Sequence, residues 1–398
     1  MNNAESGVAA APDDGAPTFS PIENEPPLRW QRALHLAPRK GLGVARRAVI
    51  FTMLAWLPLA IWAALMHRLW EGPPGEALLQ HFGVHVRCLI AIPLLVVAEA
   101  TLHKGLSKLI PQFLLSGIVA PSARHRFERI LHDVSRLRDT TLPWILVLGI
   151  ALAWTFGDAP DPQADEMSWA LGTDGRLGFG GFWLAYVARP IFVALLLGWL
   201  WRLALVIVLF ARIGRLDLSL VPTHGDRVGG LGFTQPLPSA FALVTFALAA
   251  VLASRWAHEV LYHDITVASL TVPAAMFVIG WTLLLLLPLL ALAPALIAVK
   301  RRALPAYSAL VSQHGRLVDQ RWIQREPVSD SALLEAPEIG PVADAGAMYQ
   351  AVAAMRTSPV GRRSLIPILV PIAVPMLVVV ALQVPLKDVL VKLLKTIL

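Results

Sequence analysis

Among the ionisable residues inside the long apolar runs of this sequence, four are candidates for function, because an unpaired charge there costs a few kcal/mol if the run crosses a bilayer. Glu99 and His103 are four residues apart, so a helix places both side chains on one face. Arg189 and Arg202 share a later apolar run, where their spacing corresponds to about 20 Å along a helix. These four residues are the intramembrane candidates for function.

Each candidate allows two interpretations. Glu99 and His103 can form a proton or cation relay, or they can lie at the end of a short span among lipid headgroups. Arg202 can pair with Glu99, which is the only acid in the apolar runs, or it can extend to the inner leaflet. Arg189 follows the aromatic residues Trp183 and Tyr186, which predicts a place near the opposite interface.

A second group of candidates lies in the glycine-rich stretch Pro-Thr-His-Gly-Asp-Arg-Val-Gly-Gly-Leu-Gly-Phe, at 222–233. Successive glycine amides can form an anion-binding nest, an arginine can clamp a phosphate or carboxylate, and histidine with aspartate can transfer protons. The alternative is a tight turn whose polar side chains hold it together. The residues concerned are His224, Asp226, Arg227, Gly229 and Gly230.

The composition indicates which elements must position these residues. Of 398 residues, 56% are hydrophobic and only 15% are charged, whereas soluble domains usually carry about a quarter charged residues. These values exclude a disordered chain and a soluble enzyme, and they predict an all-α polytopic membrane protein in contact with a lipid bilayer. The one cysteine, Cys88, excludes a disulfide framework.

Seven apolar runs are long enough, at about 20 residues, to be considered as membrane spans. The fourth and sixth are overlong, and the seventh carries prolines at a spacing of four, which leaves open a model of six spans and a re-entrant end. The predicted spans are 48–66, 88–107, 141–157, 182–211, 238–256, 267–299 and 365–384.

The distribution of basic residues predicts how the chain threads the membrane. Alternate segments between the runs, starting with the N-terminal one, hold 25 Lys and Arg, whereas the other segments hold 4. Because basic loops stay in the cytoplasm, we expect a cytoplasmic N-terminus. The excess of arginine over lysine suggests a GC-rich bacterial source, and therefore a bacterial inner membrane.

The chain divides into four parts on these grounds. We expect a disordered N-terminal tail over 1–28, a transmembrane bundle over 29–299, a cytoplasmic helical hairpin over 300–363, and a proline-kinked span with an amphipathic tail over 364–398. The basic stretch 122–138 has an apolar stripe, which fits either a helix on anionic lipid headgroups or a helix packed on the protein.

The glycine-rich stretch and the hairpin together resemble a family of uncharacterised bacterial polytopic membrane proteins. Members typically have proline where this chain has Gly225, and aspartate where it has Glu338. The resemblance implies architecture only, because no activity is assigned to the family. It rests on 224–233 and on Tyr307, His314, Trp322, Glu338, Ile339, Ala343, Asp344, Met355, Arg356 and Pro359.

Three functions are compatible with these features. The first is a channel or transporter for a small ion or solute, indicated by proline-broken helices and intramembrane charges. The second is a membrane scaffold or sensor that engages a cytoplasmic protein partner, and the third is a membrane enzyme acting on lipid or phosphate. We expect a homo-oligomer without a catalytic residue set, metal site, cofactor or nucleic-acid partner.

Overall fold

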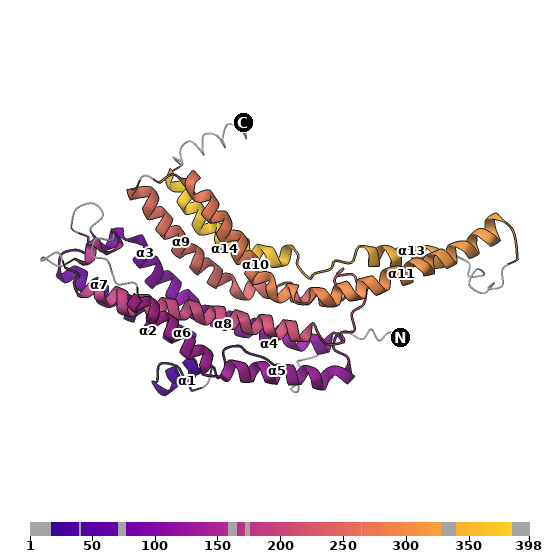
Figure 1. Cartoon of the computed structure of the whole chain (residues 1–398), viewed down its shortest axis with the longest axis horizontal. Helices are drawn as coiled ribbons and strands as arrows, with labels where there is room; N and C mark the ends of the chain where they lie inside the picture. Colours follow the sequence, from indigo (N-terminus) through magenta and orange to yellow (C-terminus); the bar gives the residue numbers. More distant parts are fainter. Residues whose placement is uncertain are drawn as a thin grey trace, which may run out of the picture.

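The computed structural model describes residues 17–39, 41–70, 77–157, 165–171, 176–263, 265–327 and 340–383. These parts form a helical bundle, and they contain no β-sheet beyond two isolated bridges. Figure 1 shows most helices lying side by side, with α11 and α13 extending away from the rest. The all-α polytopic fold predicted from composition is therefore confirmed. The C-terminal stretch 386–398, predicted to be amphipathic, lies outside the described residues.

The longer helices follow the predicted runs. The main helices are α1 (Pro26–Ala33), α2 (Val44–Leu65), α4 (Ile92–Leu115), α5 (Arg124–Asp139), α6 (Leu142–Gly157), α8 (Arg189–Ile213), α9 (Ala242–Tyr262), α10 (Thr271–Leu290), α11 (Ala293–Val318), α13 (Gly340–Ala353) and α14 (Arg362–Gln383). Short α-helical and π-helical turns extend two of them at the start: α3 (Phe82–His85) and η2 (Val86–Ala91) precede α4, and α7 (Phe179–Trp183) and η5 (Leu184–Ala188) precede α8.

Within the described residues, seven helical segments are long and apolar enough to cross a membrane, as predicted. The sixth predicted run divides at Ala291 and Leu292, so its second part becomes the start of α11. The last run forms one continuous helix, α14, despite three internal prolines. Those prolines lie on its half-buried or buried side, where protein neighbours shield the backbone groups that lack partners.

The outer faces of four spans carry large apolar side chains at helical spacing. Such continuous apolar surface is unfavourable in water and matches hydrocarbon, so these faces contact lipid. The exposed residues are Val49, Met53, Leu57 and Ile61 on α2, Ile145 and Leu152 on α6, Val272, Met276, Ile279 and Leu283 on α10, and Ile366, Val370, Val374 and Leu377 on α14.

The N-terminal segment corrects one prediction. Residues 17–28 were expected to belong to a disordered tail, but Phe19, Ile22 and Leu28 are buried in the core. These apolar residues pack into the core cluster, and Pro26 and Pro27 start α1, so this part of the acidic and proline-rich stretch is ordered. Residues 1–16 lie outside the described part of the chain.

The amphipathic stretch 122–138 forms α5, and its apolar stripe packs on the protein. Phe127, Leu131 and Val134 are buried. The Phe127 ring lies 6.0 Å from that of Phe113 on α4, which in turn contacts Phe210 on α8 at 6.1 Å. The arginines of the opposite face stay exposed.

The hairpin consists of α11 and α13, which pack against each other. Lys300 on α11 donates hydrogen bonds to the carbonyl oxygens of Ala353 (3.0 Å) and Met355 (2.5 Å), at the end of α13. A cation at a helix C-terminus satisfies carbonyl groups that lack helical partners. Lys300 thereby joins the two arms at the hairpin base, and α11 and α13 project beyond the rest of the bundle (Figure 1).

The threading gives a direct test. Cys88 is fully buried, so a Cys88→Ala chain offers a background for single cysteines at Arg176 and at Glu326, both exposed. A membrane-impermeant maleimide applied to intact cells is expected to label Arg176→Cys only, and Glu326→Cys only after permeabilisation. Labelling of both sites in the same compartment would contradict the arrangement of spans.

Candidate functional site

Four charged side chains form a buried network between the spans. The Arg47 guanidinium on α2 forms an ion pair and hydrogen bonds with the Glu99 carboxylate on α4. Arg202 on α8 binds the same carboxylate, with Nη2 at 2.9 Å from Oε1. Arg202 also binds Glu25, with Nε at 3.1 Å from Oε2 and Nη2 at 2.5 Å from Oε1. All four side chains are at most 3% exposed, so two cations and two carboxylates compensate each other away from water.

The first turn of α2 and the segment around α1 close the network. Arg47 lies in that first turn, and its Nε donates to the side-chain oxygen of Gln31 on α1. Its Nη1 also donates to the Leu42 carbonyl at 3.3 Å. Glu25 immediately precedes α1, whose two leading prolines fix the direction in which the chain enters the helix.

The contact with Arg47 sets the depth of the network. Because Arg47 begins the first span, Glu99 lies level with the end of that span and not at the bilayer centre, where a start of the second run near Cys88 would place it. Beyond Glu99, α4 continues for about 24 Å. The N-terminal segment covers the network at this level, so lipid headgroups are not needed to solvate its charges.

Two indole rings pack against Arg202. Its guanidinium carbon lies 5.2 Å from the ring centre of Trp199 and 5.8 Å from that of Trp144, distances at which cation–π attraction operates. Trp144, on α6, reaches this position because Gly198 on α8 has no side chain. A Cβ there would lie 2.9 Å from the Trp144 ring.

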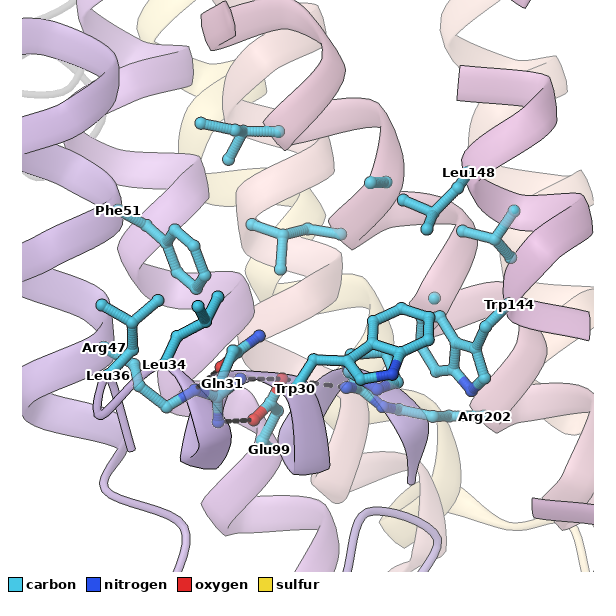
Figure 2. A pocket seen from close by; sticks show the side chains of 16 residues that line it. Trp30, Gln31, Leu34, Leu36, Arg47, Phe51, Glu99, Trp144, Leu148 and Arg202 are labelled. Carbon is cyan, nitrogen blue, oxygen red and sulfur yellow. Dashed lines mark hydrogen bonds and ion pairs between the residues drawn. The ribbon is translucent and has the colours of Figure 1, made fainter. Parts of the chain in front are cut away.

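A cavity of about 300 Å³ opens beside the network. Figure 2 shows it with Phe51 on one side and Trp144 on the other, and with Glu99 and Arg202 at the end that carries the charges. Its walls come from α1, α2, α6 and α8, and the network arginines and Glu99 supply most of its polar atoms. The arrangement can hold a molecule that combines an apolar part with a polar or charged group.

Further contacts hold the N-terminal segment in place. The hydroxyl of Ser20 lies 2.9 Å from Nδ1 of His103, and its carbonyl accepts a hydrogen bond from Nη1 of Arg138 at 2.5 Å. His103 also lies 3.9 Å from the Glu23 carboxylate. Burial raises the pKa of the Glu25 carboxyl to about 7, although the charge of Arg202 opposes the rise. Glu25 is therefore a network member that can gain a proton near neutral pH.

The predicted intramembrane residues have different positions. The ion pair between Arg202 and Glu99 is confirmed. His103 contacts the N-terminal segment through Ser20. Arg189 starts α8, about 20 Å along the helix from Arg202, so it belongs to another level of the bundle.

Sequence reasoning missed two members of the network, Glu25 and Arg47. Arg47 was counted among the basic residues before the first span, and Glu25 was counted within a tail. A usable signal was present in the spaced apolar residues Phe19, Ile22 and Leu28, which a freely solvated tail does not need.

The glycine-rich loop forms a nest that its own aspartate fills. One carboxylate oxygen of Asp226 accepts hydrogen bonds from the amides of Val228 (2.8 Å) and Gly230 (3.1 Å), and the other accepts from Gly232 (2.8 Å). Gly230 has a φ of 95°, which favours glycine. Burial disfavours the charged carboxylate, but these amides and His224, at 2.9 Å, outweigh it and lower the pKa of Asp226.

The loop also docks on the segment that follows α13. The Arg356 amide donates to the Arg227 carbonyl at 2.7 Å, and the Arg356 guanidinium donates to the Asp226 carbonyl at 3.4 Å. Met355 is buried next to Gly229. Loop and hairpin base, which carry most of the motif residues noted above, are thus in contact, and the loop has the geometry of a self-contained turn.

Comparison of the chain with protein families, with curated proteins and with solved structures finds no match.

The charged network predicts a large effect of a small substitution. Glu99→Gln removes the charge that compensates two buried guanidinium groups, so we expect a loss of about 3–5 kcal/mol in the free energy of unfolding. Unfolding in detergent micelles measures this loss. Glu23→Gln is the control, because Glu23 is half-exposed and outside the network, and it should change stability by about 0.5 kcal/mol at most. Equal stabilities of the two variants would contradict the network.

The filled nest predicts the effect of Asp226→Asn. The amide retains one acceptor oxygen and no charge, so we expect a loss of about 1–3 kcal/mol in the stability of the loop. Because the pKa of Asp226 is lowered in the fold, the difference from the wild type should be present above about pH 4 and vanish at lower pH. Limited proteolysis of the loop over this pH range measures it, and a difference that persists in acid would contradict the assignment.

Proposed function

We propose that this integral membrane protein is a channel- or transporter-like protein for a small ion or solute, with the charged network as its inner gate. The observation that carries the proposal is the position of Glu25. It comes from a segment outside the spans, yet it completes a network that otherwise consists of span residues. Such a segment can leave without unfolding the bundle.

The electrostatics of the network support a gate. With Glu25 docked, two guanidinium groups face two carboxylates. Departure of the segment exposes Arg202 and leaves a net positive site next to the cavity, which attracts an anion or repels a cation. A protonation change at Glu25 alters the same balance, since the pKa of this carboxyl is about 7. The opening and closing of the gate are thus coupled to the charge of Glu25.

A second candidate function is a scaffold or sensor for a protein partner. The projecting α11–α13 hairpin favours it, because Trp322 and Ile323 near the tip are 63% and 73% exposed. Large exposed apolar side chains at a projecting tip are common in interaction surfaces. A partner bound to this tip would respond to changes at the hairpin base, where Arg356 donates a hydrogen bond to the Asp226 carbonyl of the glycine-rich loop.

The proposal includes the membrane in which the protein lies, its orientation there and its contacts. The excess of basic residues supports a cytoplasmic N-terminus in a bacterial inner membrane. The exposed arginines of α5 support contact with anionic headgroups. We further propose that the chain belongs to the bacterial family that its loop resembles and that it assembles as a homo-oligomer.

Flux through proteoliposomes tests the gate. Glu25→Gln weakens the attachment of the N-terminal segment, and a weakening by about 1.4 kcal/mol increases the undocked population about tenfold. We therefore expect an increase of that order in flux of at least one of Na⁺, K⁺, H⁺ or Cl⁻ under an imposed gradient.

Glu326→Gln serves as the control, because it removes an exposed carboxylate of the hairpin and leaves the N-terminal segment unchanged, and it should conduct like the wild type. Flux equal to that of protein-free liposomes for wild type and Glu25→Gln alike would contradict the gate and leave the scaffold as the better account.

A further inference from the structure

The cavity beside the network has an apolar wall that is several side chains long. Phe51 on α2, Leu148 on α6, and Ile191 and Leu195 on α8 line it away from the charges. At about 300 Å³ it lies at the lower end of the range for ligand sites. These dimensions suit one aliphatic chain better than a two-chain lipid.

Two side chains that line the cavity each carry a buried polar atom that lacks a partner within the described residues. They are Nη1 of Arg202 and Nε1 of Trp144, both hydrogen-bond donors, on side chains that are 2% and 5% exposed. Both residues line the cavity, and the Arg202 guanidinium lies 5.8 Å from the centre of the Trp144 ring. An unsatisfied buried donor costs about 1–3 kcal/mol, so these two donors favour a ligand with acceptor oxygens.

The opening of the cavity is apolar as well. Trp30 on α1, Leu34 directly after α1 and Leu148 on α6 line it and are 41%, 68% and 40% exposed. Leu148 lies on a span whose outer face contacts lipid, so a ligand can enter from the hydrocarbon region with its chain. A purely polar solute has no favourable route along these walls.

We infer that this cavity binds a long-chain fatty acid, with its carboxylate at Arg202 and Trp144 and its chain along the apolar wall. We choose a carboxylate as the polar group because Arg202 already binds one within the protein: its Nε and Nη2 donate to the carboxylate of Glu25. The two unpartnered donors match the two oxygens of such a group. The inference concerns binding alone and does not depend on transport.

Equilibrium binding of radiolabelled palmitate to the purified full chain in detergent tests the inference. Ala194→Phe places a ring in the cavity wall and is expected to weaken palmitate binding at least tenfold. The matched control is Leu200→Phe on the same helix, at an exposed position outside the lining, and it should bind like the wild type. Circular dichroism and gel filtration confirm that each variant is folded.

Trp144→Phe tests the headgroup contact, because it keeps the ring and removes the N–H donor. Loss of one hydrogen bond to a charged group should weaken palmitate binding about tenfold. The methyl ester of palmitate should compete poorly for the same reason. The inference would be overturned if Ala194→Phe and Trp144→Phe both bound palmitate as the wild type does. It would also be overturned if phosphatidylglycerol or the methyl ester competed with radiolabelled palmitate as effectively as unlabelled palmitate does.

Discussion

Charge compensation away from water is the interaction on which the rest of this structure depends. Glu99 faces two guanidinium groups, and Arg202 faces two carboxylates, at a level where neither lipid nor water solvates them. The desolvation of four such charges is costly, and it is tolerable only while all four remain together. The network therefore fixes how α2, α4 and α8 meet, and it requires a carboxylate that the spans do not supply.

That requirement explains the N-terminal segment. Its apolar residues are few, and on their own they bury too little surface to order a chain. Docking becomes favourable because Glu25 compensates Arg202 and Ser20 contacts His103 and Arg138. The segment is thus ordered mainly by polar contacts. Because these contacts weaken when the charge of Glu25 changes, they suit a gate better than a permanent structural element.

The sequence predicts the parts of the fold that periodicity and hydropathy control. The spans, the hairpin and the ion pair of Arg202 with Glu99 follow from run length, loop composition and the cost of an unpaired intramembrane charge. The partners Arg47 and Glu25 do not follow, because their roles depend on which helices adjoin and where a short segment returns to the bundle. For the glycine-rich loop the sequence leaves two interpretations, an anion-binding nest and a turn held by its own polar side chains, and the hydrogen bonds of Asp226 decide for the turn.

A double-mutant cycle between Glu25 and Arg202 measures directly whether these two residues compensate each other's charge. Unfolding free energies in detergent are compared for the wild type, Glu25→Gln, Arg202→Gln and the double variant. We expect the double variant to lose less stability than the two single variants together. The difference, which is the coupling free energy of the pair, should be about 0.5–3 kcal/mol. Losses that add to within about 0.5 kcal/mol would show that the two groups act independently and would contradict the network.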